Sequence, residues 1–359
     1  MPFPPTDPWL LIDPSFRDVG LRSAAEAIVG LVRSGGNDPV EIELTPGVVV
    51  ALARHRVSTL IPPHLVATEQ QATQHRRRLR AVYGTQMRIQ AAAIDVLSLL
   101  SDVGIATRVL KGLASAELDY PSLEYRWTGD VDLAVPPEEI ERAIAVLRAN
   151  GFTDHLPNPP DPRLVRGATL RSPNGVEVDL HTRLFRRGSA DDPFECAGVP
   201  LTSVPGLALP AERRLVHAAG HLMVTTPGKR RMSGLVDITR ILDTAVLDPD
   251  RVRQLAIDSG VAAMVGVALD LEATLTGRRR NESWLRDWPR PSHLERATFL
   301  GPTRPLLQHL WGVQGFPIRR LPAYGAIWLR PGRERMVAYK GSQRAYWRYL
   351  AHQLKGQDR

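Results

Sequence analysis

Two aspartates one residue apart constrain the fold and the chemistry of this chain more than any other feature. They lie in residues 126–135, RWTGDVDLAV, where polar and apolar residues alternate before an apolar run, which predicts a β-strand. Successive side chains of a strand point to opposite faces, so Asp130 and Asp132 share one face, with Cα atoms roughly 6.6 Å apart. Like charges at about 4 Å repel by about 4 kcal/mol at a protein-surface dielectric, so we expect a neutralising cation. Oxygen ligands favour Mg²⁺ or Mn²⁺, and Mg²⁺ characteristically binds one or two carboxylates plus substrate phosphates.

The composition is that of a soluble globular protein. The chain has 359 residues, 43% hydrophobic and 23% charged, which allows a sizeable core and two or three domains. It shows no secretory signal, and no apolar run reaches the roughly 20 residues needed to span a bilayer. The single cysteine, Cys196, excludes an intramolecular disulfide and a multi-cysteine zinc site. We therefore expect a cytoplasmic location.

The net charge of +8 favours an anionic partner, such as a nucleotide, a nucleic acid or an acidic lipid surface. The alternative is that the arginines form solvated clusters, at 76–78, 186–187 and 278–280. No aromatic residues are interleaved with these clusters, as they are in nucleic-acid-binding surfaces. Nucleic acid is therefore a less favoured ligand.

The pattern of apolar residues divides the chain into four regions. Residues 1–104 form an N-terminal helical region, with helices at 17–32, from Pro46 (capped by Thr45) to about Arg54, and at 67–103, which we expect to pack as one bundle. Residues 105–204 mix strands and helices, residues 205–290 form a C-terminal helical domain, and residues 291–359 form a tail rich in Pro, Arg and Trp. Residues 342–354 of the tail are a candidate amphipathic basic helix that packs on the body or docks on a membrane or partner.

Within 105–204 the predicted elements are short. We expect strands at 107–110 and 130–135, helices at 113–118 and 136–147, and a hairpin of 164–171 with 176–182 around the Asn-Gly turn at 174–175. After residue 205 we expect helices at 210–224, 234–245, 249–259 and 261–275. The middle region is thus a mixed unit flanked by helices on both sides.

The second arm of the hairpin carries further acidic residues. Strict alternation places Glu177, Asp179 and His181 on one face and apolar residues on the other. The alternative is a solvated outer face, but two acids beside another acidic strand are unfavourable unless a cation joins them. Glu177 and Asp179 compete for the place of a third metal-binding carboxylate, and we favour Asp179 because apolar residues flank it next to His181.

A third feature precedes the acidic strand. At Lys111 and Gly112 a strand meets a glycine and then a short helix, a junction that can present backbone N–H groups and a lysine charge to a phosphate. Alone this junction is weak evidence. In order with the two acidic strands, it supports a metal site for a phosphate-bearing substrate.

This order resembles the nucleotidyltransferase superfamily related to DNA polymerase β, with an apolar residue and glycine, an Asp-x-Asp strand and a third carboxylate on a neighbouring strand. More narrowly, it looks like an uncharacterised bacterial nucleotidyltransferase family. The residues that carry the resemblance, across roughly residues 10 to 245, are Leu110-Lys111-Gly112, Tyr120-Pro121, Arg126, Asp130-Val131-Asp132-Leu133, Gly151-Phe152 and Val178-Asp179-Leu180-His181. One departure is Leu113, which stands after Gly112 where the superfamily usually has serine or glycine.

The resemblance implies an α+β fold: a polymerase β-like palm, a small mixed sheet with flanking helices, between N-terminal and C-terminal helical regions. It implies that Asp130 and Asp132 hold two Mg²⁺ (or Mn²⁺) ions and that Asp179, or else Glu177, completes the site. Two-metal sites of this kind stabilise the attacking and leaving oxygens of an in-line displacement.

The resemblance also implies roles for the neighbouring residues. Lys111 and Gly112 would meet the triphosphate. Arg126 would bind a phosphate or brace the acidic pair, or simply form a salt bridge. His181 would orient a carboxylate or contact phosphate, or be a structural histidine.

Downstream, His217 and His221 stand one helical turn apart, followed by a basic triplet at 229–231 and by Asp237. The two histidines could share a metal, but no third ligand is evident. The favoured interpretation places His221, the triplet and Asp237 at the palm cleft, where they contact nucleotide or acceptor. Asp237 is a candidate general base for the acceptor hydroxyl.

The expected function is therefore transfer of a nucleoside monophosphate from an NTP, ATP included, to a hydroxyl or phosphate group, with release of pyrophosphate. The acceptor is a small molecule, a sugar, a peptide or RNA. The alternatives are a catalytically inactive nucleotide- or RNA-binding protein with the same palm, and a toxin-like enzyme that modifies tRNA.

Overall fold

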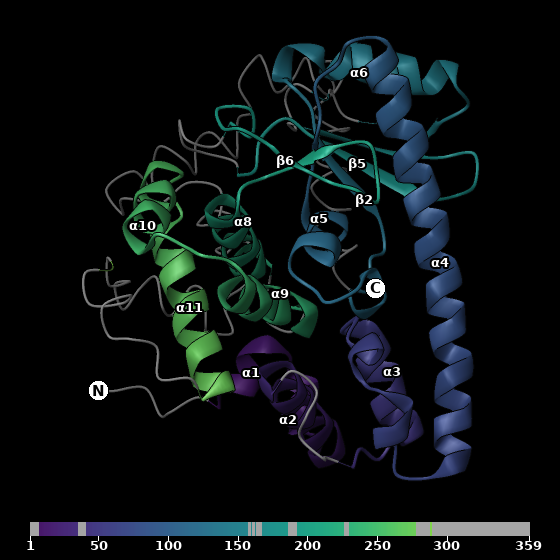
Figure 1. Cartoon of the computed structure of the whole chain (residues 1–359), viewed down its shortest axis with the longest axis vertical. Helices are drawn as coiled ribbons and strands as arrows, with labels where there is room; N and C mark the ends of the chain where they lie inside the picture. The colour runs from purple at the N-terminus through teal and green to yellow at the C-terminus, as the bar shows by residue number, and fades with distance from the viewer. Residues whose placement is uncertain are drawn as a thin grey trace, which may run out of the picture.

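The fold is known from a computed structural model that describes residues 7–34, 41–156, 159, 162, 167–185, 192–225, 230–277 and 288. Helices from the beginning and the end of this range flank one mixed sheet (Figure 1). The expected class, α+β with a small mixed sheet between helical regions, is confirmed.

The N-terminal helices begin at their predicted caps. Thr45 Oγ1 accepts a hydrogen bond from the Val48 amide at 3.3 Å, and Pro46 is the first helical residue, as expected. Thr68 Oγ1 accepts from the Gln71 amide at 3.2 Å and caps a helix of 34 residues. The helices are α1 (Pro8–Ile12), α2 (Val19–Ser34), α3 (Pro46–Arg54) and α4 (Glu69–Asp102), with 3₁₀ helices η1 (Pro14–Arg17), η2 (Ser58–Leu60) and η3 (Pro63–Leu65).

Seven strands of the described chain form the sheet, in the order β3-β4-β5-β2-β1-β7-β6. The acidic strand β2 lies in its middle, parallel to β5 and antiparallel to β1. The predicted hairpin is confirmed as β4 and β5, paired antiparallel. The strands are β1 (Arg108–Val109), β2 (Val131–Ala134), β3 (Thr153–Asp154), β4 (Gly167–Arg171), β5 (Glu177–His181), β6 (Val199–Pro200) and β7 (Leu207–Ala208).

Helices connect several of the strands, and further helices come after the last strand in the sequence. Ile140, Ala143, Ile144 and Leu147 recur at helical spacing and are buried, which explains why α6 packs on α4. The connecting elements are α5 (Lys111–Leu118), η4 (Leu123–Tyr125), η5 (Pro137–Glu139) and α6 (Ile140–Ala149). The sheet is followed by α8 (Ala211–Val224), α9 (Met232–Thr244), α10 (Pro249–Asp258) and α11 (Ala262–Thr276), close to the four predicted helices.

Buried apolar side chains form two large cores. The palm core joins the sheet, α6 and the C-terminal half of α4, and includes Val96, Leu133 and Leu180. The helical core joins α1–α3 to α8–α11 and includes Phe16 and Ile238. The helical core therefore joins the two ends of the described chain, and the palm core comes from the middle.

The expectation that the helices before residue 104 form one bundle is wrong. Helices α1 and α2 pack against the C-terminal helices α9 and α11, and α3 packs on α2. The beginning of α4 contacts η2 and η3, but its second half places Ile89–Leu100 against the sheet. Figure 1 shows α4 running along one edge of the molecule past both regions. Since α2 and α9 are far apart in the sequence, no local pattern could indicate their contact.

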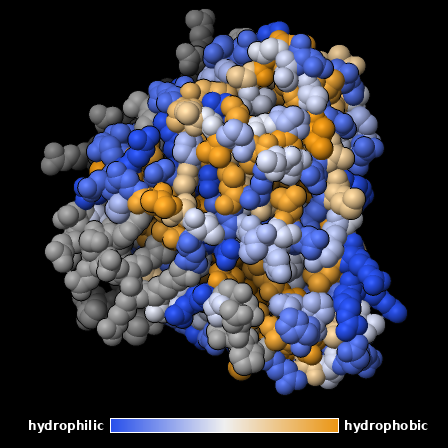
Figure 2. All heavy atoms as spheres, in the orientation of Figure 1, coloured by the Kyte–Doolittle hydropathy of each residue, from blue (hydrophilic) through white to orange (hydrophobic). Residues whose placement is uncertain are grey.

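The molecular edge along α4 is strongly hydrophilic at the lower right and mixed above it (Figure 2). Arg77, Arg78 and Arg80 are exposed there, and Arg76 forms an exposed ion pair with Glu69 at 3.0 Å. No described helix is long and apolar enough to cross a membrane. The predicted tail at 291–359, with its candidate helix at 342–354, lies outside the described residues.

Candidate functional site

The acidic site is built on the pairing of β2 with β5. In this parallel pair, Asp132 lies directly opposite Asp179, and Leu133 lies opposite Leu180. The leucines belong to the palm core, so the pleat turns both aspartates to the other face of the sheet. Backbone pairing thus brings together two carboxylates that are 47 positions apart in the sequence.

Asp132, Asp179 and His181 form a group that fits a metal ion, each offering a ligand atom within 4.8 Å of the others. Asp132 Oδ1 accepts hydrogen bonds from Lys111 Nζ at 2.6 Å and from His181 Nε2 at 2.8 Å. Asp179 Oδ1 is buried and has no hydrogen-bond partner among the described residues. A buried carboxylate oxygen without a partner is costly, which favours a cation beside it.

The two aspartates differ in their electrostatics. Burial alone would raise the pKa of Asp132, but Lys111 and His181 outweigh it and hold that pKa well below its usual range. Burial raises the pKa of Asp179, and the neighbouring Asp132 raises it further, while a hydrogen bond from Thr169 opposes the shift. Its neighbours therefore keep Asp132 ionised, whereas burial opposes ionisation of Asp179.

Asp130 lies just before β2 and at the same pocket, but outside the three-residue group. Its Oδ1 is 3.5 Å from Arg56 Nη1, and both side chains are partly exposed. The two carboxylates predicted to work as a pair thus face different cationic partners.

Glu177, the alternative to Asp179, has other partners. It is 3.1 Å from His155 Nδ1 and 3.4 Å from Arg171, and its side chain is 42% exposed. It is not part of the group formed by Asp132, Asp179 and His181. The geometry favours Asp179 over Glu177 as the third carboxylate.

Lys111 and Gly112 open α5 directly beside the acidic strand, and both line the pocket. Gly112 packs under Thr128, because a Cβ at this glycine would lie 2.8 Å from Thr128 Oγ1. The glycine therefore allows the start of α5 to approach the segment that leads into β2. Lys111 was expected to meet the triphosphate, and in this structure its ammonium group donates to Asp132 Oδ1 instead.

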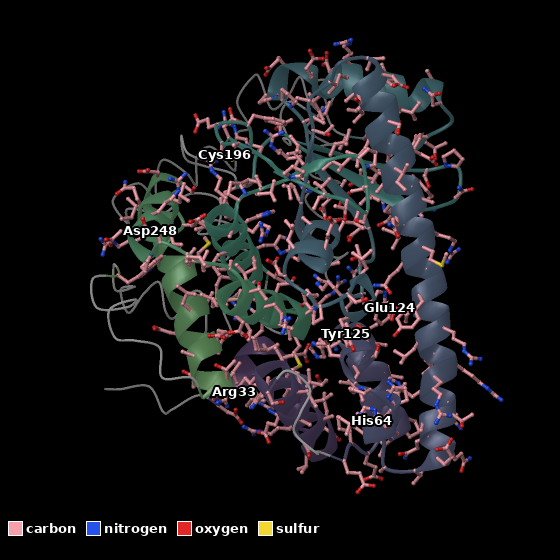
Figure 3. The ribbon with its side chains drawn as sticks, in the orientation of Figure 1. Arg33, His64, Glu124, Tyr125, Cys196 and Asp248 are labelled. Atoms are coloured by element: carbon pink, nitrogen blue, oxygen red, sulfur yellow. The ribbon has the colours of Figure 1, made fainter. Side chains whose placement is uncertain are left out.

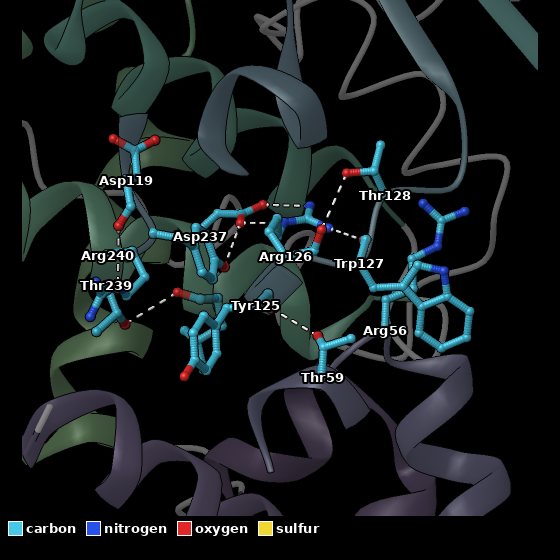
Figure 4. Close-up of polar contacts among 12 residues, drawn as sticks. Arg56, Thr59, Asp119, Tyr125, Arg126, Trp127, Thr128, Asp237, Thr239 and Arg240 are labelled. Carbon is cyan, nitrogen blue, oxygen red and sulfur yellow. Dashed lines mark hydrogen bonds and ion pairs between the residues drawn. The ribbon is translucent and has the colours of Figure 1, made fainter. Parts of the chain in front are cut away.

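Arg126 and Asp237 form a buried ion pair between the palm and α9 (Figure 4). Arg126 donates to both carboxylate oxygens, at 2.6 and 2.8 Å, and Tyr120 Oη donates to Asp237 Oδ1 at 2.8 Å. Of the interpretations considered for Arg126, the geometry fits the salt bridge. Because both oxygens of Asp237 are engaged, holding Arg126 is a better-supported role for Asp237 than proton removal.

The segment before β2 is anchored from two other helices. Gln86 on α4 donates to the carbonyls of Leu123 and Arg126, at 3.2 and 2.6 Å. Thr59 donates to the Tyr125 carbonyl at 2.8 Å. Figure 3 shows Glu124 and Tyr125 beside α4, above α3. These contacts hold the chain that delivers Asp130 and Asp132.

His217 and His221 both line the pocket from α8, with ring centroids 6.2 Å apart. Burial lowers the pKa of His217 well below its usual value, and the charge of Lys111 adds to the shift. His221 is exposed, and the charge of Lys111 lowers its pKa to about 3. Both rings are therefore neutral near pH 7, and neither belongs to the metal-ligand group found among the described residues.

Two arginines from the helical region also line the pocket. Arg231 lies just before α9 and lines the pocket together with Arg56, which follows α3. Arg231 belongs to the basic triplet expected at the cleft, whereas Arg56 carries no sequence signal that we could recognise. Arg230 is buried instead, where it donates to the Leu222 and Thr225 carbonyls near the end of α8.

The pocket enclosed by these residues has a volume of about 370 Å³ and lies between the palm and the helical core. This size is within the range of small-molecule sites. Carboxylates and cationic side chains line it together, with Lys111 Nζ 2.6 Å from Asp132 Oδ1 and Arg56 Nη1 3.5 Å from Asp130 Oδ1. Such a site can hold a cation and a polyanion side by side.

Comparisons with known proteins identify one family that covers most of the chain. A search of curated proteins found no match. The solution structure of the antibiotic-resistance factor ANT(2'')-Ia is similar over 51% of this chain and 94% of its own, with 16% identity and a TM-score of 0.32. The family model described as "Uncharacterised nucleotidyltransferase" matches residues 46–277, which include the acidic strands, the pocket and the helices α8 to α11. The chain is therefore a member of this nucleotidyltransferase family.

Proposed function

We propose that this enzyme transfers a nucleoside monophosphate from an NTP to a hydroxyl or phosphate group of an acceptor, with release of pyrophosphate. The observation that carries the proposal is the convergence of Asp132, Asp179 and His181 beside a pocket that lysine and arginine side chains also line. In the proposed division of the chain, residues 105–204 form the catalytic palm.

The described residues fit a divalent metal. Asp132 and Asp179 would hold it, with Asp130 close enough in sequence to share a second ion, and the unpartnered Asp179 Oδ1 supports this fit. Carboxylate oxygens favour Mg²⁺ or Mn²⁺. When bound, such ions supply Lewis-acid stabilisation of the phosphates and activation of the acceptor hydroxyl.

The protein's own groups would bind and orient the substrate. Lys111 supplies a charge for phosphate oxygens, and the start of α5 supplies backbone N–H groups. His221 is neutral at physiological pH and can donate or accept a hydrogen bond at the nucleotide or acceptor. Arg126, fixed by Asp237, keeps the entry to β2 rigid.

Asp132→Asn tests the proposal. The purified chain is incubated with each labelled NTP, ATP first, with Mg²⁺ and with acceptor panels of sugars, small alcohols, peptides and RNA, and pyrophosphate release is measured. Metal stabilisation of a phosphoryl-transfer transition state is worth several kcal/mol, so we expect a loss of at least about 100-fold. Metal-dependent NTP binding without turnover on any acceptor would instead indicate a nucleotide-binding protein.

Asp179→Asn and Glu177→Gln form a matched pair on one strand. Each removes one carboxylate charge, but only Asp179 lies in the group with Asp132. We expect Asp179→Asn to abolish turnover and Glu177→Gln to retain it. Equal loss in both variants would refute the choice of Asp179.

A further inference from the structure

Two residues with the same unusual backbone conformation meet at the acidic site. Among the described residues, only Arg56 and Lys111 combine a side chain with a positive φ, at 55° and 48°. This left-handed region is disfavoured for residues other than glycine, and such strain is concentrated at functional sites. Arg56 follows the third helix and Lys111 begins the fifth, yet both line one pocket.

Each of the two cations contacts one carboxylate of the Asp-x-Asp pair. Lys111 Nζ lies 2.6 Å from Asp132 Oδ1, and Arg56 Nη1 lies 3.5 Å from Asp130 Oδ1. The side chains of Lys111 and Arg56 are 24% and 21% exposed, so they reach the acids from the pocket wall. The cationic groups thus stand beside the oxygens that a metal would take as ligands.

The conformation of Arg56 is held by its surroundings. The His55 carbonyl accepts from the Ser233 amide at 3.2 Å, and the Met232 amide donates to His55 Nδ1 at 3.3 Å, which fixes the end of α3 to the start of α9. The guanidinium lies over Gly129, where a Cβ would overlap it. Glycine at this position therefore leaves the space through which Arg56 approaches Asp130.

A divalent cation and these side chains compete for the same carboxylates. An ammonium group at hydrogen-bond distance occupies a lone pair of Asp132 and repels any further positive charge. A polyphosphate removes the conflict, since its oxygens can take over the lysine and arginine charges. Arg231, on the same wall, adds to the positive potential that such an anion would meet.

We propose that Lys111 and Arg56 are resident counter-ions, which release Asp132 and Asp130 to the metal and transfer to the phosphate oxygens of the incoming nucleotide. The proposal rests on the proposed function, because it takes a metal–polyphosphate complex as the ligand. It predicts that metal alone binds weakly and that metal and nucleotide bind cooperatively.

The test is Mn²⁺ binding by calorimetry, with and without a non-hydrolysable NTP analogue or pyrophosphate. Lys111→Gly and Arg56→Gly remove each cation and also relieve its backbone conformation, so the variants should fold. Lys111→Asn and Arg56→Asn are second variants, since asparagine tolerates this conformation. Arg77→Gln, on the exposed face of α4, is a charge-matched control.

For Mn²⁺ alone, we expect affinity to rise about tenfold in Lys111→Gly, an ordinary size for coupling between ligands, and less in Arg56→Gly, where the ion pair is longer. Affinity for the analogue or pyrophosphate in the presence of Mn²⁺ should fall in both variants. The cooperativity between metal and nucleotide should fall with it, and the control should match the wild type.

Unchanged Mn²⁺ affinity in all four variants, with wild-type turnover intact, would overturn the inference and leave the proposed function standing. Tighter Mn²⁺ binding and lost cooperativity in the variants, with no turnover by the wild type on any acceptor, would support the inference while the transfer activity fails. Lower analogue affinity without any gain in Mn²⁺ affinity would also overturn it, because the cations would then bind phosphate without competing for the acids.

Discussion

The palm core and the helical core differ in how their residues are distributed along the chain. The palm core draws on one continuous stretch, from Ile89 to Ala208, whereas the helical core joins residues 9–72 to residues 215–288, with Tyr120 added. The acids of the site come from the first core. Arg56 and Arg231 come from the two separated segments of the second. The metal-binding group and Lys111 are therefore local to one stretch of the sequence, whereas Arg56 and Arg231 reach the site only when distant segments pack.

The largest expected effect on the free energy of unfolding comes from removing the buried ion pair between the palm and α9. Arg126→Met leaves Asp237 buried without its cation, and the loss of one partner of a buried pair costs about 3–5 kcal/mol. Urea unfolding of the variant measures this free energy. Arg148→Met, which removes an exposed partner of Asp154 within the palm, is the control and should cost under about 1 kcal/mol.

Equal costs for the two variants would show that the buried pair does not hold the cores together. A double variant, Arg126→Met with Asp237→Leu, separates the two contributions. It should recover much of the lost stability, because the uncompensated charge is gone.

A second effect distinguishes the helical core by pH. Burial lowers the pKa of His55 to about 4; Asp13 opposes the shift, and Arg54 and Arg231 add to it. Between pH 4 and 6.5 the unfolded chain binds more protons at this residue than the folded chain does. The contribution of His55 to the free energy of unfolding is therefore fully present above about pH 6.5. It falls as the pH drops toward 4, by up to about 3 kcal/mol.

His55→Asn, which retains an acceptor for the Met232 amide, should flatten this dependence. The free energy of unfolding is measured at pH 7.5, 5.5 and 4.5 in both proteins, and the difference between them isolates His55 from the other histidines. An identical pH slope in both would contradict the assignment.

The smallest expected change in stability is at Gly129, over which the Arg56 guanidinium lies. In Gly129→Ala the new methyl group displaces the flexible end of Arg56, so stability should change by less than about 1 kcal/mol. Nucleotide affinity in the presence of Mn²⁺ should nevertheless fall several-fold, since the displaced Arg56 guanidinium can no longer contact the phosphate oxygens from this position. Gly84→Ala, on α4 with open space at its Cβ, should leave affinity unchanged and raise stability by about 0.5–1 kcal/mol.

The sequence predicts those parts of the fold and site that depend on patterns between neighbouring residues. The alternation of polar and apolar residues predicts which side chains of β2 and β5 share a face. The Asn174-Gly175 pair predicts the hairpin, and Thr45 with Pro46 predicts the start of α3. The two-residue strands β3, β6 and β7 are too short for periodicity to indicate them.

The pocket also depends on contacts between distant segments, which sequence patterns do not indicate. Arg56 was missed because its importance depends on packing between α3 and α9 and on the space over Gly129, neither of which leaves a pattern in sequence. Asp237 was found at the cleft, but only the coordinates reveal that Arg126 and Tyr120 engage its carboxylate. Long-range partners decide what a polar residue can do.

The direct opposition of Asp132 and Asp179 also determines where relatives can vary in length. A deletion or insertion of one residue inside either strand would turn the acid to the apolar side, because side chains alternate at every position. The exposed hairpin turn and the connections between strands face no such restriction. An alignment of relatives should therefore keep each acidic motif free of gaps and confine its gaps to the segments between them.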